Sequence, residues 1–482
     1  MSAERKRLYE LYEAVIGLEI HVELKTASKM FCRCRTDFGL PMNTACCPVC
    51  MGYPGTLPVP NGEAVRKTVA AGLALGCNIE RASRFSRKNY FYPDLPKAYQ
   101  ISQDEMPLCT HGGIEITGDD GNKKRIGIER IHLEEDAGKL IHTESGTLVD
   151  YNRCGIPLAE IVTEPDLRSA EETSRFVKKL RNILVYSEIS DCRMNEGSLR
   201  CDVNISVRKK GDVSLGVRAE IKNLNSFRFI EEAIEYEFLR QAELLDGGGL
   251  VALETRRYDE NSGKTCSMRP KESHSDYRFF EEPDIGDIIL TEDEIERIKA
   301  SLPELPDSRE RRYLEWGLSP DDSAIIIGER RYSDYFDSAA QYVPKEHISG
   351  LGKFFSQAIK SIFSEDGKSA SLSAKHLAMI HEMLADGKIS SSSAKKLISL
   401  CAESGDAPED VALREDMYMI TDREKILRVV KDAIERSPKA AADFKSGKTS
   451  AAKSVVGLVM SISGGKVDPR IASELTMQIL GE

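Results

Sequence analysis

The chain reads Ile16-Gly17-Leu18-Glu19-Ile20-His21-Val22-Glu23-Leu24 near its N-terminus, so that apolar and polar side chains alternate. A period of two is typical of a β-strand whose apolar residues face a core. Glu19, His21 and Glu23 would then share the other face, open to water, a metal ion or a charged ligand. For one strand alone, a half-solvated antiparallel strand explains the pattern better than a site does.

Later stretches repeat this pattern. Over 128–139, Arg130, His132 and Glu134 would share one strand face, and Glu135 falls out of phase unless the strand ends or bulges there. The stretch 200–208 has an ionic face that consists of Arg200, Asp202, Asn204, Ser206 and Arg208. The stretch 217–222 has an ionic face that consists of Arg218, Glu220 and Lys222. Four such strands predict an antiparallel β-sheet with helices behind it and an open, charged floor in front, an α+β fold.

The charged floor mixes carboxylates, histidine and guanidinium groups. Carboxylates suit Mg²⁺ and guanidinium groups suit phosphate, so the mixture is typical of a metal-nucleotide site. The sequence has neither a Walker-type phosphate loop nor a kinase-type glycine loop, so a nucleotide site here would be unusual. Helices predicted from Ser169 and over about 226–245 would form the scaffold behind the sheet.

Two close cysteine pairs mark a candidate zinc site. They are Cys32 with Cys34 and Cys47 with Cys50, separated by twelve residues, and Cys46 is an extra neighbour that could compete as a ligand. Four thiolates at this spacing fit tetrahedral zinc. The 12 cysteines of a chain without a secretion signal are better explained as reduced or metal-bound than as a disulfide framework.

The chain has 482 residues, which predicts roughly three domains. We expect a catalytic domain over 1–290, a helical domain over 291–402, where helical periods replace strand signals, and a small helical tail over 403–482. Net charge is −11, yet 421–482 carries 11 Lys or Arg against 8 Asp or Glu, so any nucleic-acid contact would be local. Without a signal peptide or membrane-spanning run, we expect a cytoplasmic protein.

Longer motifs carry a family resemblance. They are Val15 to Leu24, Cys47-Pro48-Val49-Cys50-Met51-Gly52-Tyr53-Pro54-Gly55, Arg87-Lys88-Asn89-Tyr90-Phe91-Tyr92-Pro93-Asp94-Leu95-Pro96-Lys97 and Glu220-Ile221-Lys222-Asn223-Leu224-Asn225-Ser226. Through these motifs and over essentially its whole length, the chain resembles the B subunits of tRNA-dependent aspartyl/glutamyl amidotransferases. Archaeal E-type relatives carry an inserted domain for which 289–302 leaves no room, so the resemblance favours the B type.

The resemblance implies a two-step reaction. The protein would bind tRNA misacylated with glutamate or aspartate, phosphorylate the side-chain carboxylate with ATP and Mg²⁺, and let ammonia displace the phosphate. Its partners would be an amidase A subunit, which supplies ammonia from glutamine through a channel, and a small C subunit. No amidase Ser-Lys constellation is recognisable in this chain, which agrees with an external nitrogen source.

The resemblance also implies residue roles. Mg²⁺ would be held by Glu19, His21, Glu135 and Glu220. Because histidine is a poor ligand for so hard an ion, His21 would support a ligand instead of binding the ion itself, or the site would also accept manganese. Phosphate contacts would come from Ser198, Arg200 and Lys222, and Lys88 would lie at the channel mouth or the acyl phosphate. Glu23 keeps its solvent-facing interpretation.

The tail resembles a tRNA-binding domain, although Ser461-Ile462-Ser463-Gly464-Gly465-Lys466 is only mildly basic. We therefore expect 421–482 to bind tRNA weakly and with strong salt dependence. Two other functions fit the sequence. The first is a non-catalytic scaffold that binds tRNA through its ionic sheet, and the second is a free-standing ATP-dependent ligase that is active without partner chains.

Overall fold

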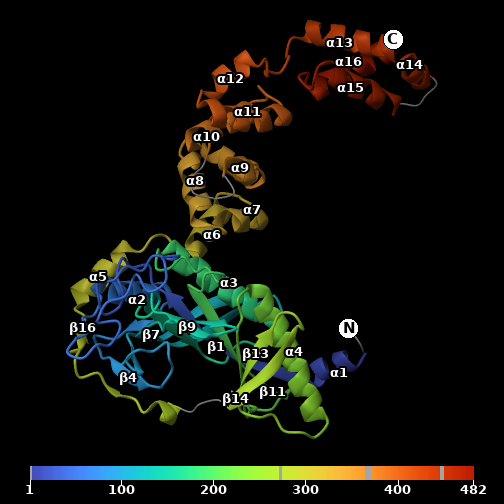
Figure 1. Ribbon diagram of the computed structural model, residues 1–482. Coiled ribbons are helices and arrows are strands. Elements are labelled where there is room, and N and C mark those ends of the chain that lie inside the picture. Colours follow the sequence, from blue (N-terminus) through green and yellow to red (C-terminus); the bar gives the residue numbers. More distant parts are fainter. Residues whose placement is uncertain (1–2, 271–273, 364–370, 446–449, 482) are drawn as a thin grey trace. The chain divides into compact units, whose positions relative to one another are not determined.

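The computed structural model describes residues 3–270, 274–363, 371–445 and 450–481. The chain forms two compact units, Met1–Pro306 and Asp307–Glu482 (Figure 1). The first contains the β-sheets, and the second is helical. The predicted α+β class is confirmed.

A nine-stranded sheet organises the first unit. Its spatial order is β14 (Lys264–Pro270), β13 (Glu254–Asp259), β12 (Ala219–Lys222), β11 (Leu199–Lys209), β1 (Tyr12–Glu23), β10 (Pro157–Thr163), β7 (Lys123–Glu135), β6 (Cys109–Thr117) and β2 (Asn78–Ile79). The opening stretch thus belongs to the central strand β1, where Leu18, Ile20 and Val22 are buried as the alternation predicts. The four strands predicted to carry an ionic face all belong to this sheet.

The sheet is antiparallel except between β12 and β13, which pair in parallel. This pair departs from the predicted antiparallel sheet because the connection between the two strands is the long helix α4 (Phe227–Asp246), not a hairpin. A helical crossover returns the chain in the same direction. The helix predicted to begin at Ser169 and the helix predicted over about 226–245 are present as α3 (Ala170–Tyr186) and α4, capped by Ser169 and Ser226.

Helices cover the apolar side of the sheet. Figure 1 shows α3 and α4 side by side, and their buried residues join one core with those of β1 and of α2 (Gly62–Ala74). Helix α1 (Ala3–Leu11) contributes Leu8 to the same core. Because apolar residues alternate with polar ones along the strands, burying one face directs the ionic side chains to the other.

Shorter elements complete this unit. They are a sheet of β15 (Phe280–Glu281), β4 (Ser86–Asn89) and β5 (Tyr99–Ser102), the pairs β16 (Ile288–Ile289) with β3 (Ala82–Ser83) and β8 (Lys139–Thr143) with β9 (Gly146–Asp150), the 3-10 helix η1 (His274–Tyr277) and helix α5 (Glu292–Ser301). The predicted first domain ends at 290, whereas the compact unit extends to Pro306. The reason is that α5 buries Ile295 and Ile298 in the first core.

The second unit is built from helices. They are α6 (Pro306–Glu315), α7 (Pro320–Ile327), α8 (Arg330–Ala340), η2 (Lys345–His347), α9 (Ile348–Ile362), α10 (Ala374–Ala385), α11 (Ser391–Ser404), α12 (Pro408–Arg414), α13 (Arg423–Arg436), α14 (Pro438–Lys445), α15 (Ala451–Ile462) and α16 (Pro469–Gly481). One hydrophobic cluster runs from Tyr313 to Ala412 and another from Ile426 to Leu480. The division of the chain into three domains stays a prediction. In the described part of the chain, each helix is too short or too polar to traverse a lipid bilayer.

Candidate functional site

The ionic face of the central sheet lines a cavity of about 390 Å³. Side chains of β1, β7, β10, β11, β12 and β13 reach it from the sheet, and Lys88, Tyr90 and Tyr277 reach it from outside the large sheet. Of the residues predicted for the site, the cavity contains Glu19, His21, Lys88, Arg200, Glu220 and Lys222. The shared floor predicted from alternation is therefore one surface of the folded protein.

The first acidic cluster consists of Glu19, Asp202 and Glu220. Glu19 lies directly opposite Asp202 in the β1–β11 register, and carboxylate oxygens of all three residues lie within 4.8 Å of one another. Asn204 Nδ2 donates to Glu19 at 2.9 Å, and Thr255 Oγ1 donates to buried Glu220 at 2.7 Å. Three oxygen donors with fixed orientations form a suitable site for a hard divalent cation.

Lys222 compensates the charge of this cluster. Its ammonium group pairs with Asp202 and lies 3.5 Å from Glu220 Oε1. Burial disfavours the charged lysine, but the two carboxylates outweigh burial and raise the pKa of Lys222 above its ordinary value. A bound cation would compete with this ammonium for the same oxygens, which would release Lys222 toward another anion.

The second cluster consists of His21, Glu134 and Glu160. The pairing of β10 with β1 and with β7 brings these side chains together. His21 on β1 lies opposite Glu160 on β10, and Glu160 lies opposite His132 on β7. His21 Nε2 lies 3.2 Å from Glu134 Oε1 and 3.4 Å from Glu160 Oε2, and His132 Nε2 lies 3.2 Å from the same Glu160 oxygen. One nitrogen and two carboxylates form a donor set that Mn²⁺ accepts as well as Mg²⁺.

The charges in this second cluster are coupled. Burial opposes an imidazolium, but Glu160 and Glu134 outweigh burial and raise the pKa of His21 to about 10. Burial likewise opposes ionised carboxylates, but His132 and His21 hold the pKa of Glu160 well below its ordinary value. The proton on His21 therefore neutralises the position that a cation would occupy.

Cationic side chains surround the two clusters. Arg200 Nη2 donates to Asp136 at 2.8 Å, and Arg200 lies opposite His21 in the β1–β11 register. The Lys88 ammonium lies 4.9 Å from the ring centre of Tyr277 and 5.9 Å from that of Tyr90. A cavity with carboxylates at its floor and cations at its walls can hold a metal-bound polyphosphate.

Two predicted site residues lie elsewhere. Glu135 points to the opposite side of β7, where it pairs with Lys97 at 2.5 Å and accepts the N–H of Ile101 at 3.0 Å. Its neighbour Glu134 occupies the place in the cavity that the prediction gave to Glu135. Ser198 caps a turn: its hydroxyl accepts the Arg193 N–H at 2.8 Å and is not part of the cavity lining.

Sequence reasoning assigned no role to Glu160 and none to Asp202 beyond its place on an ionic face. The signal for Glu160 is a single carboxylate inside the apolar run Pro157–Thr163, which has no reason to be buried unless it has a partner. Glu23, which the sequence predicts to face solvent, is partly buried. Burial together with the Asp136 charge raises the pKa of Glu23 to about 8.

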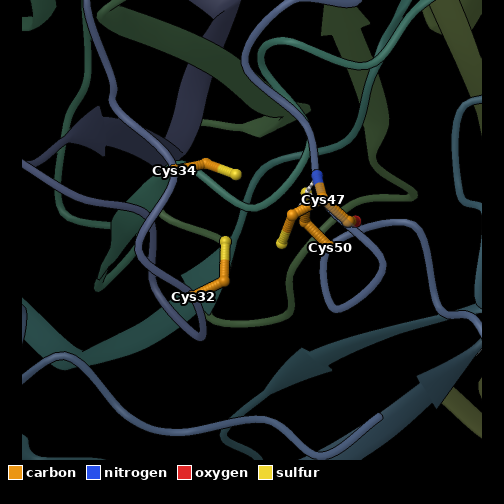
Figure 2. Close-up of side chains that lie close together, drawn as sticks. All are labelled: Cys32, Cys34, Cys47 and Cys50. Atoms are coloured by element: carbon orange, nitrogen blue, oxygen red, sulfur yellow. Dashed lines mark hydrogen bonds between the residues drawn. The ribbon is translucent and has the colours of Figure 1, made fainter. Parts of the chain in front are cut away.

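The four predicted zinc ligands form a separate cluster. The sulfur atoms of Cys32, Cys34, Cys47 and Cys50 lie within 4.8 Å of one another and converge on the space between two loops (Figure 2). Cys46 is not a member of this group. The hydrogen bond with Cys32 lowers the pKa of the Cys50 thiol to about 5, against burial and with help from the Cys47 N–H and the Lys29 ammonium. We call residues 29–59 with this cluster the cysteine knot.

Comparisons with known proteins agree over nearly the whole chain. Residues 14–296 match the family described as "GatB/GatE catalytic domain", and residues 334–480 match the "GatB domain". Proteins named as the B subunit of aspartyl/glutamyl-tRNA(Asn/Gln) amidotransferase are similar to this chain. The one from Caldicellulosiruptor bescii is 48% identical over 97% of this chain and 99% of the relative. Those from Brevibacillus brevis and Thermodesulfovibrio yellowstonii are each 45% identical, over 97% and 98% of this chain and 99% and 100% of the relatives.

Proposed function

Because the chain belongs to the GatB family of amidotransferase B subunits, we propose that its ionic cavity activates the side-chain carboxylate of a misacylated tRNA. The protein is a component of a glutamine-dependent, tRNA-dependent amidotransferase, a ligase that uses ATP. Its match to the catalytic domain of the family does not favour the alternative of a non-catalytic scaffold.

One observation supports this proposal above the others: two donor sets and several cations converge on one cavity. A carboxylate is a poor electrophile until one of its oxygens becomes a leaving group, and phosphorylation by ATP provides this. Phosphoryl transfer depends on positioning and on stabilising charge around the transferred group. The cavity supplies both the metal-binding carboxylates and the cationic side chains from a rigid sheet.

The donor sets fit divalent cations. Glu19, Asp202 and Glu220 offer oxygen ligands for Mg²⁺, while His21, Glu134 and Glu160 offer a mixed set for Mg²⁺ or Mn²⁺. When bound there, such ions would stabilise the negative charge of the phosphate groups as Lewis acids. Glu135, by contrast, is engaged by Lys97 and would support the strand from behind.

The cations in the cavity then have separate tasks. Arg200 and Lys222 would hold phosphate oxygens. Lys222 pairs with Asp202, a carboxylate that a metal ion would partly claim, and Arg200 is positioned by Asp136 outside the two donor sets. Lys88, whose ammonium group lies beside the rings of Tyr90 and Tyr277, would orient the acyl phosphate toward incoming ammonia. Attack by ammonia forms the C–N bond, breaks the C–O bond to phosphate and releases a proton to water or to a nearby carboxylate.

Partners follow from the same assignment. Membership among the B subunits implies partner chains and tRNA. We assign the ammonia supply to an amidase A subunit, a supporting role to a small C subunit, tRNA binding to the helical tail, and the complex to the cytoplasm. Zinc in the cysteine knot is a further assignment, since four converging thiolates are the donor set that zinc prefers.

The complex assembled from this chain and its partner chains tests the function. Given ATP, glutamine and both misacylated tRNAs, it should form glutaminyl-tRNA, asparaginyl-tRNA or both, and product analysis would identify the substrate. Omission of ATP should abolish the product. Full activity without ATP would contradict carboxylate activation, and activity of this chain alone with glutamine would favour a free-standing ligase.

His21 allows a pH test of whether it is a direct metal ligand. Its pKa of about 10 means that the ring is protonated at neutral pH, so a cation that binds Nε2 must displace a proton. Below this pKa, raising the pH removes the competing proton. We therefore expect Mn²⁺ affinity to rise by about tenfold per pH unit from roughly pH 6.5 to 8. Isothermal titration measures this slope. His21→Gln should flatten it, and a flat slope in the unmodified protein would leave His21 outside the ligand set.

A further inference from the structure

The geometry points to Lys29 as a positioning residue of the cysteine knot, whose ammonium group compensates the charge of a metal-bound tetrathiolate. This inference rests on the metal site proposed for the knot. It does not depend on the chemistry of the large cavity. It assigns to a buried lysine a role that neither the cysteine motif nor the family match specifies.

Lys29 is completely buried, with 0% of its surface exposed. Its Nζ lies 3.7 Å from Cys50 Sγ and 3.2 Å from the carbonyl oxygen of Tyr151. No carboxylate in the described part of the chain lies within ion-pair distance of it. A buried ammonium group without an anionic partner is costly, so its surroundings must supply negative charge.

The adjacent Lys97 shows how the fold treats a buried lysine at the same cavity. Both lysines line a small cavity of about 180 Å³, which Cys32 and Cys50 of the knot also line. Lys97 has a carboxylate partner, Glu135, at 2.5 Å. Where Lys97 has a carboxylate, Lys29 has the sulfur atom of Cys50 at 3.7 Å from its Nζ. The contrast indicates that the anion for Lys29 is the thiolate of Cys50.

The backbone holds Lys29 against the knot. Its N–H donates to the carbonyl of Cys34 at 2.9 Å, and the next N–H, from Met30, donates to Gly155 at 2.7 Å. Gly155 has φ +85°, and a Cβ there would lie 3.5 Å from Lys29 Cδ and 3.6 Å from Cys50 Cβ. This positive φ favours glycine, and it lets the loop close over the lysine. The ammonium group is thus fixed and shielded from water.

The chemistry of the knot explains the need for this cation. Four thiolates around one Zn²⁺ leave two excess negative charges, and an ammonium group in contact with one sulfur removes one of them. A hydrogen bond to a charged sulfur also withdraws electron density, which makes the thiolate less nucleophilic and less easily protonated. Lys29 would therefore keep Cys50 bound to the metal and slow its loss. Neutral thiols in the knot would leave the ammonium group uncompensated.

The test compares zinc release from the full chain and from three variants at this position. Lys29→Met removes the charge and the donor, Lys29→Gln removes the charge but keeps an N–H donor on a shorter side chain, and Lys29→Arg keeps both. We expect zinc transfer to a chromogenic chelator to become about tenfold faster or more in the Met and Gln variants and to stay near the original rate in the Arg variant. In the cobalt-substituted protein, the thiolate-to-metal charge-transfer bands should move to lower energy in the same two variants.

Controls separate charge from packing. Lys124→Met removes a partly buried ammonium group that pairs with Glu172 away from the knot, and it should leave zinc release unchanged. Lys29→Met keeps much of the apolar stem, so equal release rates in the Met, Gln and unmodified proteins would show that only the stem matters and would overturn the inference. Absence of zinc or another thiophilic metal from the unmodified protein would overturn the metal site itself. Retained zinc with unchanged rates would overturn the role of Lys29 alone.

Discussion

Glu134→Gln is expected to lower ATP-dependent transamidation by about 100-fold or more, whereas Glu135→Gln should leave the chemistry nearly intact and lower stability. The two residues are neighbours on β7 but face opposite sides of the sheet. Glu134 lies 3.2 Å from His21 in the cavity, and Glu135 compensates the buried Lys97 ammonium. Neutralising Glu134 therefore removes a metal donor. Neutralising Glu135 leaves a buried cation without its anion, at a cost of about 3 kcal/mol.

The measurements are the rate of product formation by the assembled complex and the melting temperature of each variant. Glu115→Gln is a matched control, since Glu115 is exposed on the adjacent strand β6 and pairs with Lys123 at the surface. It should change neither quantity. If Glu135→Gln abolished transamidation at unchanged stability while Glu134→Gln remained active, the orientation of this strand end would be wrong and the residue implied by the family resemblance would be the ligand.

Glu220→Gln is expected to have a similarly large effect, with loss of about 100-fold or more in transamidation and in tRNA-dependent ATP turnover, while tRNA binding is retained. Glu220 is 6% exposed and belongs to the all-oxygen donor cluster with Glu19 and Asp202. The amide keeps the shape of the side chain but removes its charge. Higher Mg²⁺ concentrations should restore part of the activity, because the loss is chiefly one of metal affinity.

Thr255 provides a graded test of the same cluster. Its hydroxyl donates to Glu220 at 2.7 Å. Thr255→Val leaves all three carboxylate ligands in place, but it should lower activity by about tenfold and raise the Mg²⁺ concentration that activity requires. Thr68→Val is the matched control, because Thr68 is equally buried but bonds to the Ala64 carbonyl within α2. Full activity of Glu220→Gln at low Mg²⁺ would contradict the assignment of this cluster to the metal.

Strands β1 and β7 show which side-chain directions the alternation of apolar and polar residues predicts correctly. On β1 the period of two correctly separates buried Leu18, Ile20 and Val22 from the ionic side chains. On β7 it correctly groups His132 with Glu134, because the register with β10 is regular from Arg130 to Glu135. The family resemblance instead implies Glu135. Because side-chain direction reverses at every residue of a strand, Glu135 is directed toward Lys97 and away from the large cavity.

Local sequence therefore determined those features that depend on neighbours in the chain: the strand faces, the capped starts of α3 and α4, and the two close cysteine pairs. Only the tertiary structure decided which strands adjoin and in which register. That pairing brings Glu160 between His21 and His132 and joins Asp202 to Glu19, while the packing of two loops places Lys29 against Cys50. The physical reason is that these contacts join residues far apart in sequence, and a cross-strand contact exists only after the sheet has fixed its order and register.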